Sequence, residues 1–370
     1  MRECSTAFGP VPARMRLAAA LLYGGGRPTA PRSEPSVLKI AILDDYAAVA
    51  RTSADWQVLD GLAEITEFDR HLGEDEAAEL LAPFDVLVTM RERMAFPRSL
   101  FERLPQLKLL TMVGRTLANL DQDAATEHGV VLVHTDFGRP AFAGVSNATP
   151  ELTWGLVLAA VRHIGPEHRR MAEGGWQQSA GIILDGRTLG LLGLGTIGKR
   201  MAHYGKAFGM DVIAWSQNLT AEAAEAEGVR RVEKDELFAQ ADVLSVHLKL
   251  SERTTGLVGA RELALMKPTS YLVNTSRGPI VDETALVDAL RERRLAGAGL
   301  DVFDEEPPRA DHPLRSLDNV TLTPHLGYVT RESLAAFYGD VPEAIAAYAQ
   351  RSPVRVVNEA ALANEKHTGG

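Results

Sequence analysis

A glycine-rich turn between a strand-like and a helix-like run is the feature that most constrains the fold of this chain. The apolar run 188–192 leads directly into Gly193, Gly195 and Gly198, spaced as G-x-G-x-x-G, and a helical pattern continues to residue 208. Such glycines are weak evidence alone, but between a strand and a helix they predict a dinucleotide-binding unit. Gly193 would allow the tight turn, Gly195 would admit a pyrophosphate to the backbone, and Gly198 would let helix and strand pack closely. The alternative is an ordinary glycine-rich turn.

Apolar runs and helical patterns alternate along most of the chain, in two series. The expected strands are 37–43, 64–68, 85–89, 107–113 and 130–135 in the first series, and 188–192, 211–215, 243–247, 271–274, 299–303 and 320–323 in the second. The expected helices include 75–81, 97–104, 151–163, 197–208, 259–265 and 282–291, and a closing helix over 331–350 is expected to return to the first series. Alternation of this kind predicts an α/β fold with parallel sheets covered on both faces.

Composition narrows the classes of partner and compartment. Among 370 residues, 39 basic and 49 acidic side chains give a net charge of −10, which argues against nucleic acid or an anionic membrane surface as the main partner. No apolar run reaches the ~18 residues that cross a bilayer. The single cysteine, Cys4, excludes disulfides within the chain and favours a reducing, cytoplasmic setting. No spacing of His, Cys, Asp and Glu indicates a metal site.

The first 36 residues differ from the rest. They are rich in Pro, Gly, Ala and Arg and poor in acids. This composition favours a disordered extension, and an organelle-targeting peptide is the alternative.

Three polar side chains follow predicted strands of the second series within a few residues. Arg277 follows 271–274, Glu306 follows 299–303, and His325 follows 320–323. Ligands of open α/β sheets bind outside the carboxyl ends of the strands. Reduction of a carbonyl by hydride requires a proton donor such as His, a carboxylate stabilises the protonated imidazole, and Arg binds a carboxylate bidentately. Each residue alone is more often structural, but the set beside a dinucleotide turn predicts an active site.

Three motifs extend this pattern into a resemblance. Residues 274–282 (NTSRGPIVD), 299–307 (GLDVFDEEP) and 323–327 (TPHLG) resemble signatures of the D-isomer-specific 2-hydroxyacid dehydrogenases, and the resemblance covers about residues 37–358. It implies a flavodoxin-like substrate domain, 37–140 completed by 326–358, with an inserted Rossmann NAD(P)-binding domain over 141–325. Residues 359–370 are expected to form a disordered tail.

The resemblance also implies roles for the three polar residues. Arg277 would bind substrate, His325 would act as acid and base, and Glu306 would be the partner of His325. Formate dehydrogenases of the same superfamily carry Gln at the position of Glu306, so the Glu speaks against that branch.

Cofactor contacts follow from the same resemblance. Thr196 and Ile197 would meet the pyrophosphate, and Thr275 and Asp301 would lie near the nicotinamide. The acidic residue expected about 20 residues beyond the fingerprint is missing, because Ser216 stands at the end of that strand. Without a carboxylate, the 2′-phosphate of NADP is not repelled, so both NAD(H) and NADP(H) remain candidates.

The substrate pocket departs from the usual pattern. The Gly-rich stretch that holds the substrate in related chains reads Gly114-Arg-Thr-Leu-Ala-Asn119 here, so Gly114 and Arg115 are the expected contributors of N–H groups. Arg91 follows a strand of the first series and could bind a second anionic group of a substrate. Pairing of Arg91 with Glu92 or Asp85 at the surface is an equally good interpretation.

The leading hypothesis is an NAD(P)-dependent oxidoreductase that interconverts a D-2-hydroxy acid and its 2-oxoacid. The alternative is an NAD(H)-sensing binding protein similar to the C-terminal-binding-protein corepressors, which share the fold and the three polar residues. The predicted helix 151–163 is apolar nearly all round, so it must be covered nearly all round. Together with the resemblance, this predicts a homodimer.

Overall fold

The computed structural model describes residues 37–113, 119–136 and 145–364. The predicted extension 1–36 and the expected pocket residues Gly114 and Arg115 lie outside the described residues. The described residues from 37 onward form one compact unit that contains two parallel sheets.

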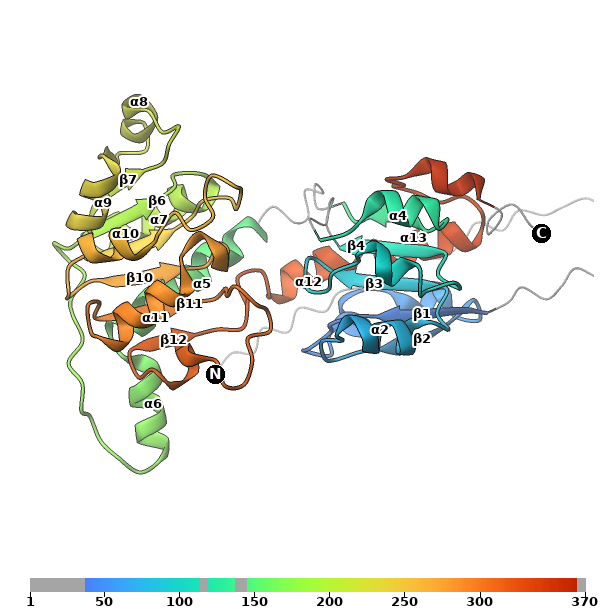
Figure 1. Ribbon diagram of the computed structural model, residues 1–370, viewed down its shortest axis with the longest axis horizontal. Helices are drawn as coiled ribbons and strands as arrows, with labels where there is room; N and C mark the ends of the chain where they lie inside the picture. Colours follow the sequence, from blue (N-terminus) through green and yellow to red (C-terminus); the bar gives the residue numbers. More distant parts are fainter. Residues whose placement is uncertain (1–36, 114–118, 137–144, 365–370) are drawn as a thin grey trace, which may run out of the picture. The chain divides into compact units, whose positions relative to one another are not determined.

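Five parallel strands form the first sheet in the order β2-β1-β3-β4-β5 (Figure 1). They are β1 (Leu38–Ile42), β2 (Ala63–Glu67), β3 (Val86–Met90), β4 (Leu109–Val113) and β5 (Val131–His134). The intervening helices are α1 (Ala50–Ser53), η1 (Trp56–Leu59), α2 (Glu74–Leu81), α3 (Arg98–Phe101) and α4 (Gln122–Glu127). Strands β3 and β4 are buried at every position, which explains their continuous apolar runs. The strand order is that of flavodoxin-like sheets, as predicted.

Seven parallel strands form the second sheet in the order β12-β11-β10-β9-β6-β7-β8. They are β6 (Thr188–Leu192), β7 (Asp211–Trp215), β8 (Arg230–Arg231), β9 (Val243–Val246), β10 (Tyr271–Asn274), β11 (Gly297–Leu300) and β12 (Val320–Leu322). The helical segments are α7 (Thr196–Ala207), α8 (Ala221–Glu225), α9 (Lys234–Gln240), α10 (Ala260–Leu265), η4 (Gly278–Ile280), α11 (Glu283–Arg291) and η5 (Pro313–Ser316). When the order is read from β8 towards β12, its first six strands follow the strand order of the Rossmann fold. Every strand expected in both series is present, and the short edge strand β8 is an addition.

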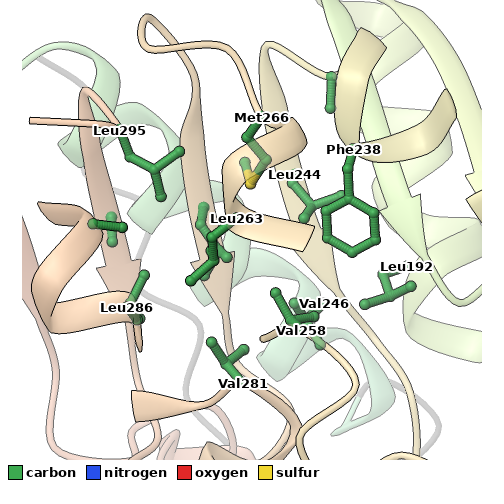
Figure 2. Close-up of a cluster of buried hydrophobic side chains, with 14 of the residues drawn as sticks. Leu192, Phe238, Leu244, Val246, Val258, Leu263, Met266, Val281, Leu286 and Leu295 are labelled. Atoms are coloured by element: carbon green, nitrogen blue, oxygen red, sulfur yellow. The ribbon is translucent and has the colours of Figure 1, made fainter. Parts of the chain in front are cut away.

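One face of the second sheet is covered by α9, α10 and α11. Figure 2 shows Leu192 of β6 and Leu244 and Val246 of β9 in one cluster with Phe238 of α9 and Leu263 of α10. All of these side chains are fully buried or nearly so. This packing fixes the carboxyl ends of the strands, where the predicted site residues begin.

The prediction of one helix over 331–350 was wrong. The structure has two helices, α12 (Arg331–Tyr338) and α13 (Val341–Ala349), with Pro342 in the first turn of the second. A proline inside a continuous helix would clash with the carbonyl four residues earlier, here that of Tyr338. At a helix start the same proline is favourable, because its missing N–H would be unpaired there anyway. Both helices contribute to the core of the first sheet.

The prediction of a disordered tail was wrong for residues 359–364. A short helical segment, η6 (Glu359–Ala363), follows Asn358, and Ala361 is fully buried against the first sheet. Asn358 fixes this segment, because its Oδ1 accepts from the Leu132 N–H at 2.8 Å and its Nδ2 donates to the Val130 carbonyl at 2.9 Å. Residues 365–370 lie outside the described residues.

The apolar helix before the second sheet is covered by its own chain. Helix α5 (Ala148–Val161) packs against α7, β10 and β11, and buries Trp154, Leu156 and Val157. Its own chain thus covers much of its apolar surface, and the homodimer stays a prediction. The next helix, α6 (Ile164–Ala172), has no buried residue. Among the described residues, no helix combines the length and the apolar character that crossing a bilayer requires.

Candidate active site

A cavity of about 1290 Å³ is lined by the segments that follow β1, β3, β9, β10, β11 and β12. Four predicted site residues line this cavity: Arg91, Arg277, Glu306 and His325. Arg277, Glu306 and His325 come together because the parallel strands of the second sheet end at the same edge, and Arg91 follows β3 of the first sheet.

His325 and Glu306 form a pair. Nδ1 of His325 lies 2.5 Å from Oε2 of Glu306, and the other oxygen, Oε1, accepts from the Phe303 N–H at 2.9 Å. An ionised carboxylate only accepts hydrogen bonds, so Nδ1 carries the proton in this pair. The second ring nitrogen of His325, Nε2, is therefore left for an external partner.

The loop that carries His325 is held by Asp301. This side chain is fully buried, and burial raises the pKa of its carboxyl against the opposing effect of its hydrogen bonds. Oδ1 accepts from Thr323 Oγ1 at 2.6 Å and from the Leu326 N–H at 2.7 Å, and Oδ2 accepts from the Gly327 N–H at 2.8 Å. His325 has a φ of +52°, a left-handed backbone conformation that the surrounding bonds maintain. The structure thus shows Asp301 directed to this loop, and its contact with a nicotinamide stays a prediction.

Arg277 follows β10 at the same edge. Its backbone carbonyl accepts from Asn274 Nδ2 at 3.0 Å, and its NH1 donates to the Ser276 carbonyl at 2.8 Å. A Cβ on the next residue, Gly278, would lie 2.1 Å from the carbonyl of Phe303. Only glycine permits this close approach, which brings the Arg277 loop beside the loop that carries Glu306.

Residues near β3 bring further charges to the cavity. Nε of Arg91 lies 3.7 Å from Oε2 of Glu92, and NH2 of Arg277 lies 4.0 Å from Oε1 of the same carboxylate. The guanidinium of Arg91 also lies over the ring of Tyr328, at 5.7 Å from its centre. Arg91, which was expected as an anion ligand, therefore has a carboxylate neighbour, Glu92. Reasoning from sequence assigned no functional role to Glu92.

Tyr328 and Arg93 are also missing from the sequence-based site. Nε of Arg93 donates to the Tyr328 hydroxyl at 2.7 Å, and the Tyr328 ring meets the His325 ring edge-on with centres 5.5 Å apart. Burial raises the pKa of Tyr328, while Arg93 opposes the shift. Tyr328 directly follows the motif 323–327 and Arg93 follows β3, but the sequence does not show that these two distant segments meet.

The glycine-rich turn has the geometry that a dinucleotide requires. Gly193 has a φ of +107°, and a Cβ on Gly198 would lie 2.2 Å from the Gly193 carbonyl. A Cβ on Gly195 would meet no atom within 4 Å, so open space lies beside it. Gly195 is the N-cap of α7 and makes no side-chain cap, while Thr196 and Ile197 begin the helix. The first N–H groups of α7 are thus available to a pyrophosphate.

Ser216 lies next to this turn. It follows β7, and the Gly193 N–H donates to the carbonyl of Trp215 at 2.9 Å. Arg231 of β8 approaches the same loop, with Nε donating to the Leu219 carbonyl at 3.0 Å. Strand pairing brings Arg231 to this loop, where its NH1 is paired with Oε1 of Glu233 at 2.8 Å.

Thr275, which was expected near the nicotinamide, and His247, which follows β9, have partners within the protein. Oγ1 of Thr275 lies 2.7 Å from Oγ1 of Thr153, and both residues are buried. His247 bonds to Ser245 Oγ through Nε2 at 2.8 Å, and burial lowers its pKa to about 3, so it is neutral at physiological pH. Among the described residues, no group of three His, Cys, Asp or Glu side chains could hold a metal ion.

Comparisons with known proteins agree with this arrangement. Residues 154–327 match the NAD binding domain of D-isomer specific 2-hydroxyacid dehydrogenases. The chain is 38% identical to D-3-phosphoglycerate dehydrogenase of Methanocaldococcus jannaschii over 76% of its own length, but spans only 52% of that relative. It is 38% identical to glyoxylate reductase of Aeropyrum pernix, covering 70% of this chain and 78% of the relative.

A solved structure supports the same assignment. Phosphoglycerate oxidoreductase of Vibrio cholerae matches with a TM-score of 0.77 and 36% identity, covering 85% of this chain and 100% of that one. Matches of this extent in sequence and in three dimensions, together with the strand orders of both sheets, lead to one conclusion. The chain belongs to the D-isomer-specific 2-hydroxyacid dehydrogenase family.

Proposed function

We propose that this protein is an NAD(P)-dependent oxidoreductase that interconverts a D-2-hydroxy acid and its 2-oxoacid. The observation that carries the proposal is the His325–Glu306 pair, which lines one cavity together with Arg277. The dinucleotide turn at Gly193 belongs to the same sheet as the strands that carry these residues.

The residues of the turn fit the cofactor. A left-handed Gly193, the open space beside Gly195 and the uncapped start of α7 form a cradle for a pyrophosphate. Thr196 and Ile197 would contact it from the first turn, and Ser216 would contact the adenosine ribose. When bound, the nicotinamide supplies the hydride for reduction or accepts it in oxidation.

The chain's own residues bind the substrate and move a proton. The guanidinium of Arg277 binds the substrate carboxylate through two parallel hydrogen bonds. In reduction, Nε2 of His325 donates its proton to the carbonyl oxygen, and in oxidation it accepts the hydroxyl proton. Glu306 holds the Nδ1 proton throughout, so it keeps the ring oriented and stabilises the protonated imidazole.

Turnover tests the proposal against the cofactor-sensing alternative. We expect the purified protein to oxidise NADH or NADPH in the presence of at least one 2-oxoacid from a panel that includes glyoxylate, pyruvate and hydroxypyruvate. Cofactor binding without oxidation by any of these acids would favour a sensing or scaffolding protein of the same fold.

The variant Glu306→Gln should shift the pH dependence of reduction. The amide cannot stabilise a protonated imidazole as a carboxylate does, so the alkaline limb of the pH–rate profile should move to lower pH. Steady-state reduction rates across pH 5 to 10 measure the shift. The exposed neighbour Glu305, changed to Gln, provides the matched control, and equal profiles for wild type and Glu306→Gln would remove Glu306 from the mechanism.

Cofactor preference should depend on Ser216. A hydroxyl bonds either a ribose hydroxyl or a phosphate and repels neither. We expect kcat/KM for NADH and NADPH to lie within roughly two orders of magnitude, because hydrogen bonds to a charged group contribute about 1.5–3 kcal/mol each. Ser216→Asp should shift preference toward NADH by repelling the 2′-phosphate. A thousandfold preference for NADH in the wild type would contradict the position assigned to Ser216.

We also propose a homodimer, and we base it on exposed apolar side chains and not on the apolar surface of helix α5. Large apolar side chains are exposed on α6 and the segment that follows it, including Met171, Trp176 at 70% and Ile183 at 78% exposure. Exposed apolar residues gathered in one segment are typical of an interaction surface.

A further inference from the structure

Glu92 occupies an unusual place in the cavity wall. Its carboxylate lies between two guanidinium groups, 3.7 Å from Nε of Arg91 and 4.0 Å from NH2 of Arg277. Arg277 is the side chain that binds the substrate carboxylate in the proposed function. The Glu92 carboxylate therefore lies within a few ångströms of a substrate that Arg277 holds.

The backbone at Glu92 is held in position. Asn119 Nδ2 donates to the Glu92 carbonyl at 3.0 Å and to the Met94 carbonyl at 2.9 Å, which fixes the segment after β3. Glu92 therefore stands in the cavity wall because of the fold and not through the freedom of a surface loop.

The side-chain oxygens of Glu92 are not engaged in the same way. Among the described residues, no hydrogen bond reaches either of them, and the side chain is 34% exposed. The carboxylate of Glu306, in contrast, has a partner on each oxygen. Glu92 can thus accept hydrogen bonds from a ligand in the cavity.

The charges of this group match one anionic group on the substrate. Arg91, Arg277 and Glu92 together carry one net positive charge, which a single carboxylate neutralises. A second carboxylate or a phosphate beside Glu92 would meet the negative charge of Glu92 directly, and like charges brought together at a binding surface are strongly disfavoured. A hydroxyl or amino group at the same position would instead donate to the free oxygens of Glu92.

We propose that Glu92 is a specificity-determining residue that restricts the substrate to a 2-oxoacid with one negative charge and a hydrogen-bond donor next to the reacting carbon. The inference rests on the proposed function and names its substrate class. It gives Arg91 a task other than the predicted one, because the Arg91 guanidinium offsets the charge of Glu92 and does not bind a second anion.

Paired substrates that differ only in a phosphate test this inference. We expect wild type to use hydroxypyruvate with a kcat/KM at least tenfold above that for 3-phosphohydroxypyruvate. In Glu92→Gln the ratio of the two constants should move toward the phosphorylated acid by roughly 10- to 100-fold, since repulsion between neighbouring charges is lost. Glu92→Asp keeps the charge and should retain most of the discrimination.

The control variant is Glu305→Gln, which removes one negative charge from an exposed residue that does not line the cavity. An equal change of the ratio in this control, an unchanged ratio in Glu92→Gln, or a wild type that prefers the phosphorylated acid would each overturn the inference and leave the proposed function intact. Absence of turnover with every 2-oxoacid in a wild type that binds NADH would instead overturn the proposed function, and this inference with it.

Discussion

His325→Ala is expected to lower the kcat for 2-oxoacid reduction by roughly 10²–10⁴-fold, the usual effect of removing a general acid. The reason is geometric, because Glu306 occupies Nδ1 of His325 and leaves Nε2 as the proton donor. Single-turnover oxidation of bound NADH at a fixed pH measures the chemical step directly. Binding of NADH, followed by fluorescence titration, should change by less than about threefold, because the dinucleotide turn lies on other strands.

The cavity offers a matched control for this experiment. His312 also lines it and also pairs with a carboxylate, since Nε2 of His312 lies 2.8 Å from Oε1 of Glu283. His312→Ala removes a second His–Glu pair that has no assigned part in the reaction, so its rate should stay within about tenfold of wild type. If the two variants lost activity equally, the loss would reflect damage to the cavity, and His325 would not be the proton donor.

Arg277→Lys is expected to lower kcat/KM for the 2-oxoacid by roughly 10–100-fold. A lysine keeps the charge but cannot present the two parallel donors of a guanidinium, and one hydrogen bond to a carboxylate contributes about 1.5–3 kcal/mol. Steady-state kinetics over a wide range of substrate concentration separates the change in KM from the change in kcat.

Arg315→Lys serves as the control for Arg277→Lys. The Arg315 guanidinium lines the same cavity but donates to the carbonyls of Pro308 and Arg309. A kcat/KM in Arg277→Lys that equals that of wild type would show that another group anchors the carboxylate.

The sequence predicted the strands well because both sheets bury their central strands on two faces. Burial of this kind requires continuous apolar runs such as those of β3, β4 and β9. These runs can be recognised in the sequence without any knowledge of the partner strand. The boundaries of helices were harder to predict from the sequence. The break between α12 and α13 depends on Pro342, whose position in an otherwise regular helical pattern was the available signal.

The residues of the candidate site also differ in how far the sequence predicts their contacts. Arg277, Glu306 and His325 follow strands within a few residues, so the topology of a parallel sheet suffices to bring them together. Glu92 and Arg93 also follow a strand, β3, and Tyr328 lies three residues after His325, so the same rule places these segments near the cavity. The sequence does not show which side chains of distant segments meet there, such as Arg93 with Tyr328 or Glu92 with Arg277.

Helix α5 illustrates a different limit of prediction from sequence. An apolar surface on all sides of a helix indicates that it is covered on all sides, but the pattern does not say which elements cover it. Here the covering elements are α7, β10 and β11 of the same chain. The prediction of burial was correct, and the homodimer stays a prediction.

The order in which the two sheets are completed has a consequence for synthesis on the ribosome. The core of the first sheet includes Leu334, Phe337, Val341, Ile345 and Ala361, all of which follow the second sheet in the chain. Between the end of β5 at His134 and the start of α12 at Arg331, about 200 residues must be translated, which takes roughly 10–40 seconds. During that time one apolar face of the nascent first sheet lacks the cover of α12 and α13, whereas the second sheet is complete once β12 emerges. We therefore expect the later-encoded sheet to fold first, and the earlier one to depend on chaperones until its covering helices leave the exit tunnel.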